Sequence, residues 1–108
     1  MHSVEIPQKD WSAKLDQFSK DYAGWLVTLE IALPSMGTRR EFRWMPLVGV
    51  TADSAAGMTI SIAVAEATGE HVTHLVSSPR RVVIQKTASG DDVALEVVDY
   101  EEIGRAHV

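Results

Sequence analysis

The side chains best suited to chemistry lie in the stretch GEHVTHLVSSPRR, residues 69–81, which holds two of the four histidines. His71 and His74 are three residues apart, and Arg81 ends the stretch. Metal binding or acid–base catalysis by both histidines would need imidazoles that converge on one point. Residues three apart share a face on a helix but point to opposite faces on a strand. The element that carries this stretch therefore decides whether the two histidines can act together.

The apolar residues around His74 alternate with polar ones, which is typical of a half-buried strand. Val72, His74 and Val76 then face the core, while His71 faces away. We therefore expect no shared metal site and no cofactor. The pattern indicates instead one histidine at a turn and one partly buried histidine, hydrogen-bonded to the backbone or to an acid.

A second group of candidate binding residues lies in TRREFRWMPLVG, residues 38–49. Guanidinium groups bind anions and an indole offers a flat apolar plate, so the group suits an anionic ligand or a protein interface. Pro46 and Gly49 interrupt the strand, which we expect to be an edge strand or sharply bent. We expect Trp44 to be at least partly exposed and to contact a second subunit or a ligand. The candidate site residues are Arg39, Arg40, Arg43, Trp44, Arg81, His71 and His74.

The elements that must position these residues follow from hydrophobic periodicity. Residues 8–23 predict a helix, because large apolar residues recur at steps of four, three and four. After Gly24 the period is two, which predicts strands separated by short turns. The set expected to face the core in the first strand is Trp25, Val27, Leu29, Ile31 and Leu33. The set expected on the opposite face is Leu26, Leu47, Leu75, Val83 and Val98.

These elements predict an α+β, mainly β protein with an N-terminal helix packed on a strongly bent antiparallel sheet of about five to six strands. An SH3-like or Sm-like partial barrel fits this order, and a cystatin-like sheet wrapping the helix is the alternative. We expect a single domain over residues 1–108, with an N-terminal arm at 1–7, the helix at 8–23, the sheet at 24–100 and an acidic tail at 101–108. The tail is expected to be dispensable for folding, because ends without packed apolar residues fray.

Composition excludes several classes of protein. The chain of 108 residues has no cysteine, is 45% hydrophobic and carries a net charge of −5, all of it from residues 89–108. Nucleic acid is an improbable partner, since a phosphate backbone attracts basic surfaces. No stretch has about 18 uncharged apolar residues, so no membrane association is expected. We expect a cytoplasmic protein.

The common catalytic and phosphate-binding signatures, such as G-x-S-x-G, H-E-x-x-H and G-x-G-x-x-G, do not occur. A succession of short pieces runs through nearly the whole chain: Ile6-Pro7, Trp11, Phe18-Ser19, Gly24-Trp25-Leu26-Val27-Thr28, Pro46-Leu47 with Gly49, Ile60-Ser61-Ile62, His71 with Thr73-His74, and Pro79 with Arg81-Val82. In this succession the chain resembles a bacterial family of small single domains of unknown function. The resemblance implies no activity, cofactor or catalytic residue.

The sequence therefore favours a non-enzymatic binding or protein-interaction module. Apolar residues on both faces of the sheet indicate self-association as a homodimer. The alternative is a binder of a small ligand or anion in the mouth of the curled sheet. A small hydrolase-like enzyme and an RNA-binding module are further alternatives.

Overall fold

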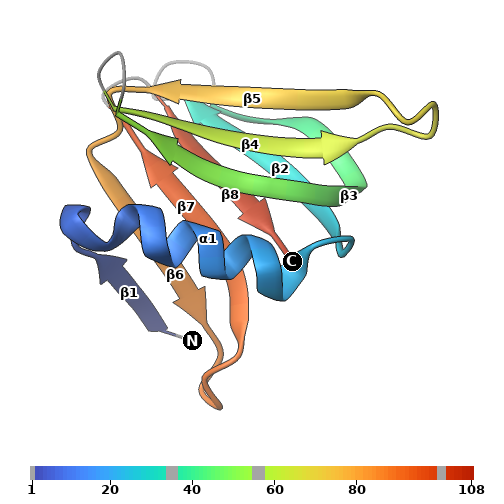
Figure 1. Ribbon diagram of the computed structural model, residues 1–108. Coiled ribbons are helices and arrows are strands. Elements are labelled where there is room, and N and C mark those ends of the chain that lie inside the picture. Colours follow the sequence, from blue (N-terminus) through green and yellow to red (C-terminus); the bar gives the residue numbers. More distant parts are fainter. Residues whose placement is uncertain (1, 34–36, 55–57, 100–101) are drawn as a thin grey trace.

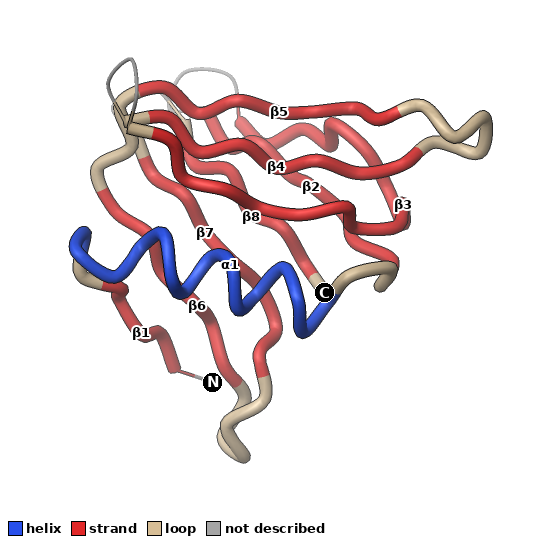
Figure 2. The backbone as a smooth tube through the Cα atoms, in the orientation of Figure 1, coloured by secondary structure: helices blue, strands red, loops and turns tan. Residues whose placement is uncertain are grey.

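The computed structural model describes residues 2–33, 37–54, 58–99 and 102–108. They form one α-helix and a large antiparallel sheet (Figures 1 and 2). Among these residues, no helix is long and apolar enough to cross a membrane. The elements are β1 (His2–Ile6), a 3-10 turn (Gln8–Asp10), α1 (Trp11–Tyr22), β2 (Leu26–Leu33), β3 (Gly37–Asp53), β4 (Thr59–Ala65), β5 (His71–Ser77), β6 (Arg81–Lys86), β7 (Asp92–Val98) and β8 (Ile103–His107).

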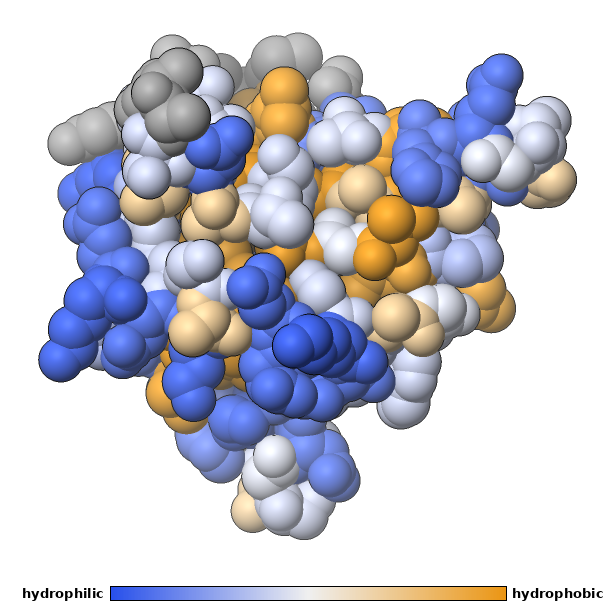
Figure 3. Space-filling view, in the orientation of Figure 1, coloured by the Kyte–Doolittle hydropathy of each residue, from blue (hydrophilic) through white to orange (hydrophobic). Residues whose placement is uncertain are grey.

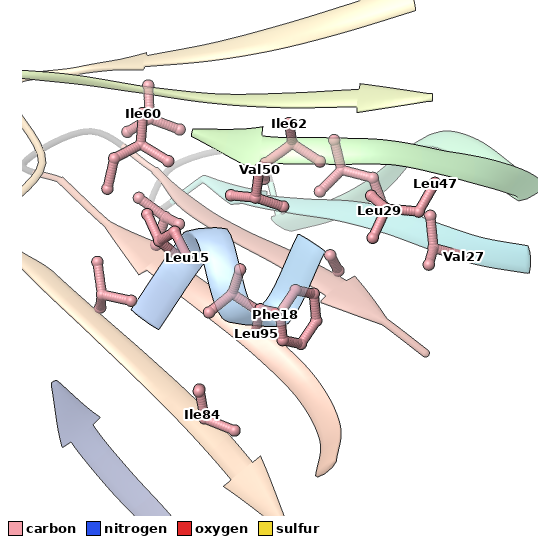
Figure 4. Close-up of a cluster of buried hydrophobic side chains, with 14 of the residues drawn as sticks. Leu15, Phe18, Val27, Leu29, Leu47, Val50, Ile60, Ile62, Ile84 and Leu95 are labelled. Atoms are coloured by element: carbon pink, nitrogen blue, oxygen red, sulfur yellow. The ribbon is translucent and has the colours of Figure 1, made fainter. Parts of the chain in front are cut away.

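The helix forms where its apolar stripe predicts it. Trp11, Leu15 and Phe18 are each no more than 2% exposed and belong to the core. Figure 4 shows Leu15 and Phe18 among the buried side chains of the sheet. Tyr22 ends the helix and donates a hydrogen bond to Asp92 Oδ2 at 3.0 Å, which links α1 to β7. Burial, then this hydrogen bond and the neighbouring carboxylates, raise the pKa of Tyr22 to about 12.

The sheet has the strand order β1-β6-β7-β8-β2-β3-β4-β5, and every neighbouring pair is antiparallel. It is not closed into a barrel, because the described parts of β1 and β5 do not pair with each other. The first half of β3 pairs with β2 and the second half pairs with β4. β3 turns sharply between these halves, so that β4 and β5 fold back over the rest of the sheet, and α1 lies in the remaining opening (Figure 1).

The core fills the space between α1 and the inner face of the bent sheet. Alternate residues of β4 and β8 reach it, as the period-two pattern predicts for a strand with one buried face. Figure 4 shows side chains from α1, β2, β3, β4, β6 and β7 meeting there. Fully buried examples are Val27, Leu29, Val50, Ile60, Ile62, Val76, Leu95 and Val97.

Two predictions about facing residues are wrong. Trp25, expected in the core, is 54% exposed, because it precedes β2 and forms the turn after the helix. Its N–H donates to the carbonyl of Tyr22, and its ring packs edge-on against the Tyr22 ring at 5.0 Å. Leu47, expected on the opposite face, is 3% exposed, because the register of β3 against β4 shifts between Leu47 and Gly49.

The described residues form eight strands, more than the five to six predicted, and the two additional strands, β1 and β8, lie nearest the chain ends. Part of the predicted N-terminal arm at residues 1–7 is β1, which pairs with β6 at the edge of the sheet. The predicted acidic tail at residues 101–108, of which residue 101 lies outside the described part, is also wrong. Residues 103–107 form β8, between β7 and β2.

A search for large apolar residues at every second position does not detect β8. Its inward positions are Gly104 and Ala106, which are small and buried. A Cβ added at Gly104 would lie 3.8 Å from Cδ1 of Ile31. The outward positions, Arg105 and His107, have carboxylate partners on the neighbouring strands. The segment predicted to be a tail is therefore a central strand, with Arg105 and His107 on its outer face.

We predict that a chain ending at Tyr100 does not fold cooperatively. It lacks β8, so β7 and β2 each lose a ladder of backbone hydrogen bonds and the core loses Ala106. Deletion of residues 1–4 is the matched control, because it shortens only the exposed edge strand β1. Urea denaturation followed by circular dichroism measures both. A truncated chain whose free energy of unfolding lies within about 1 kcal/mol of the full chain would contradict the central position of β8.

Candidate functional site

The irregular part of β3 positions the side chains that the sequence singles out. The pairing of β2 with β3 shifts register twice, between Val27 and Leu29 and between Leu29 and Glu30. Such bulges bend a strand and re-aim its side chains. Between these pairs β3 runs through Arg43 and Trp44, and Trp44 adopts a φ of +51°. A left-handed conformation is costly for a bulky residue and persists only where its surroundings hold it.

Thr28 holds the bulge in place. The backbone N–H of Trp44 donates to Oγ1 of Thr28 at 3.2 Å. Thr28 is 7% exposed, the one polar residue among the buried side chains of the described chain. Its hydroxyl therefore supplies the partner that the regular ladder would otherwise provide.

The bulge forms one wall of a pocket of about 300 Å³. The pocket lies on the outer face of the sheet, since the residues that alternate with its β2 and β8 members belong to the core. In Figure 1, α1 lies in front of the sheet, so the outer face of these strands is turned away from the viewer, and the space-filling view of Figure 3 shows the α1 side of the molecule. The lining residues come from three adjacent strands: Thr28 and Glu30 of β2, Arg40, Arg43 and Trp44 of β3, and His107 of β8.

Charge is distributed unevenly in this pocket. Oε1 of Glu30 lies 2.5 Å from Nε2 of His107, so the carboxylate and the imidazole are hydrogen-bonded partners. Arg40 is directly opposite Glu30 in the ladder. Arg40 and Arg43 are exposed, and neither forms an ion pair or hydrogen bond with a residue in the described part of the chain. Two guanidinium groups thus stay available beside a paired carboxylate.

A second ion pair, beside the pocket, joins Arg105 to Glu96. Nε of Arg105 donates to Oε1 of Glu96 at 2.8 Å, and the amide of Gln85 donates to the same oxygen. Glu96, Arg105, Glu30 and Arg40 are successive partners across β7, β8, β2 and β3. Opposite charges in facing positions stabilise a sheet. Arg105 therefore supports the sheet, and Arg40 and Arg43 are the cations that can meet a ligand.

Trp44 gives the pocket an apolar wall. Its side chain is 56% exposed, as the sequence indicates for this residue. Leu26, also outward on β2 and 53% exposed, lies opposite Pro46 next to the pocket. An indole face beside guanidinium groups can stack on a planar group that carries negative charge. The arrangement suits reversible binding of an anion that has a flat apolar part.

The structure brings together only some of the predicted site residues. Arg40, Arg43 and Trp44 line the pocket. Arg39 belongs to β3, but its side chain lies outside the described part. Arg81, on β6, has its Nε 2.8 Å from Oε1 of Glu5 and does not line the pocket, which lies on the outer face and not in the mouth of the curled sheet.

The two histidines of the 69–81 stretch are also apart from the pocket. His71 is exposed at the start of β5, while Nε2 of His74 lies 3.1 Å from Oε1 of Glu102. A partly buried histidine bonded to an acid is what the alternation indicates. In the described part of the chain, no three His, Asp or Glu side chains are grouped so that they could hold a metal ion.

Thr28, Glu30 and His107 are pocket residues that the sequence analysis missed. Glu30 and Thr28 alternate with core residues along β2, which places them on one outer face, but nothing in the sequence says that β8 lies beside them. The signal for His107 is the alternation Gly104-Arg105-Ala106-His107, small inside and charged outside. Reading glycine and alanine as core residues would have found it.

Comparison with known proteins identifies a family but no activity. A protein-family model described as "Family of unknown function (DUF5335)" matches residues 2–108, which confirms the resemblance to an uncharacterised family of small domains. No curated protein matches the chain. No solved structure matches it either.

We predict that Trp44→Gly leaves the free energy of unfolding unchanged or raises it by about 1 kcal/mol or less. Glycine adopts the left-handed conformation without cost, and the exposed indole contributes little packing. Val48→Gly is the matched control, because Val48 is also exposed on β3, at 41%, but has an ordinary φ. Urea denaturation should show a loss of stability for Val48→Gly only. A loss above about 2 kcal/mol for Trp44→Gly would mean that the indole is a packed residue of the core.

Proposed function

The chain belongs to the DUF5335 family of unknown function, and we propose that it is a non-enzymatic binding module whose outer-face pocket binds a small organic anion. The ligand has a negatively charged group and a flat apolar part. The observation that carries this proposal is the position of Trp44, an exposed indole held in a left-handed backbone conformation beside two arginines that have no described partner.

The arginines account for the negative charge of the ligand. Guanidinium groups bind carboxylates and phosphates through paired, charge-assisted hydrogen bonds, which are stronger than neutral ones. Arg40 and Arg43 lie on the same pocket wall, and neither forms an ion pair or hydrogen bond with a described residue. A ligand anion therefore need not displace an existing ion pair in order to bind.

The conformation of Trp44 accounts for the flat apolar part. Strained residues cluster at sites where the strain serves binding or catalysis. Here the bulge accompanies an aromatic side chain that is 56% exposed and a backbone that Thr28 holds. A ligand ring stacked on the indole would bury apolar surface that the free protein leaves in water.

We predict that phenyl phosphate binds saturably and quenches tryptophan fluorescence. The Arg40→Gln/Arg43→Gln double variant should bind about 10-fold more weakly or worse, a loss of roughly 1.4 kcal/mol. Isothermal titration calorimetry measures the affinities, and thermal melts check that the variants fold. Arg81→Gln is the matched control, because Arg81 is an arginine outside the pocket. Equal weakening by Arg81→Gln, or no saturable binding at all, would contradict the proposal.

A second copy of the chain is a second candidate for the partner of this outer face. The observation in its favour is that Leu26 of β2 and Trp44 of β3 are both more than half exposed on paired strands, and that Pro46, the ladder partner of Leu26, is also exposed. Contiguous exposed apolar residues mark interaction sites in soluble proteins. A homodimer that used this patch would cover the same indole that the pocket presents.

Sedimentation velocity over a dilution series distinguishes the two candidates. If the outer face mediates dimerisation, Leu26→Ser should raise the dissociation constant of the dimer about 10-fold or more. Leu75→Ser is the matched control, because Leu75 is equally exposed, at 58%, but lies on β5. A chain that stays monomeric at every concentration, or an equal effect of both substitutions, would rule out a dimer through this patch.

A further inference from the structure

A carboxylate in the wall of a cationic pocket needs an explanation. Glu30 lies directly opposite Arg40 in the ladder, yet its Oε1 is 2.5 Å from Nε2 of His107. The pocket therefore keeps an acceptor next to the cations that would hold the ligand anion. This carboxylate weakens the attraction of Arg40 and Arg43 for an anion that has no hydrogen-bond donor. A ligand that carries a hydroxyl donor close to its anionic group would be attracted, because hydroxyl-to-carboxylate hydrogen bonds are charge-assisted.

The pocket thus offers a ligand three kinds of contact. Arg40 and Arg43 supply cations, Glu30 supplies an acceptor, and Trp44 supplies an aromatic face. The matching ligand is a single small molecule that carries an anionic group, one or more hydroxyl groups and a planar ring.

We propose that the ligand is a ribonucleoside 5′-monophosphate, an inference that rests on the proposed function of the pocket. The phosphate pairs with Arg40 and Arg43. A ribose hydroxyl donates to Glu30, in the manner of the acidic residues that recognise ribose in dinucleotide sites. The base stacks on the indole of Trp44, since every base presents a π-face to an aromatic side chain.

Size and charge separate a mononucleotide from larger nucleotide ligands. The pocket volume of about 300 Å³ is at the lower end of the range for small-molecule sites, roughly 300–1,000 Å³, which leaves no room for a dinucleotide. A nucleic acid strand would need basic residues along a longer path. Next to the pocket the outer face carries Glu96 paired with Arg105, and the chain has a net charge of −5.

The test compares ligands that each lack one part of the nucleotide. Isothermal titration calorimetry is run with the four common ribonucleoside 5′-monophosphates, ribose 5-phosphate, the matching nucleosides and phenyl phosphate. The tightest monophosphate should bind about 10-fold more tightly than ribose 5-phosphate and than its own nucleoside. In Trp44→Ala, the monophosphate and ribose 5-phosphate should bind with equal affinity.

The role of Glu30 is tested by a cycle of ligand and protein changes, which isolates one contact. Removal of both ribose hydroxyls, as in the 2′,3′-dideoxy monophosphate, should weaken binding to the wild-type protein about fivefold or more. In Glu30→Ala the two ligands should bind equally. If Glu30→Ala fails to fold, Glu30→Gln, which keeps the shape of the side chain but not its charge, should at least halve the difference between the two ligands.

The outcomes separate this inference from the proposed function. If phenyl phosphate binds and the monophosphates bind no more tightly than ribose 5-phosphate, the nucleotide assignment is overturned and anion binding stands. The nucleotide assignment is also overturned if the 2′,3′-dideoxy monophosphate binds the Glu30 variants as much more weakly than the ribonucleotide as it binds the wild-type protein. If neither phenyl phosphate nor any monophosphate binds, both proposals fall.

Discussion

The constraint on which the rest of this structure depends is that β3 must keep its backbone hydrogen-bonded while it changes partner. Its first half pairs with β2 and its second half with β4, so the regular ladder is interrupted in between. Buried N–H and C=O groups cannot be left without partners. At the turn, the Leu47 N–H donates to the carbonyl of Trp25, and the Leu47 carbonyl accepts from the N–H of Gly24. Further along, Oγ of Ser19 on α1 accepts from the N–H of Val50 at 2.8 Å. The helix and the turn after it therefore complete the ladder of the strand they cover.

The candidate site is a consequence of the same interruption. Before the turn, the bulge removes Trp44 from the regular pairing, and Thr28 replaces the missing partner. The indole and the guanidinium groups of Arg40 and Arg43 then project outward over β2 and β8, where Glu30 and His107 are paired. One irregular strand thus serves the fold on its inner face and forms a pocket on its outer face. Bulges occur beside functional sites for this reason.

Much of this could be predicted from the sequence, and the exceptions share a physical cause. The helix, the alternation of β4 and the bend near Pro46 and Gly49 are local patterns, and each is confirmed. The strand β8 was missed because its inward residues, Gly104 and Ala106, are small. His107 and its pairing with Glu30 were therefore missed as well. These two residues are 77 positions apart in the sequence, and the register that brings them together depends on the whole sheet. The group of Arg40, Arg43 and Trp44 was found because a single segment of chain carries all three.

The three tryptophans allow one direct measurement, because each indole N–H gives its own signal in a ¹H–¹⁵N correlation spectrum. Trp11 is 2% exposed and its Nε1 donates to the carbonyl of Ile6 at 2.8 Å, so its signal is an internal reference for the core. Trp25 is exposed outside the pocket. If the outer-face pocket is the binding site, added phenyl phosphate will shift the Trp44 indole and the backbone amides of Thr28 and His107, and will leave the Trp11 indole in place. Shifts confined to Trp25, or an unchanged spectrum at saturating ligand, would contradict a binding site at Trp44.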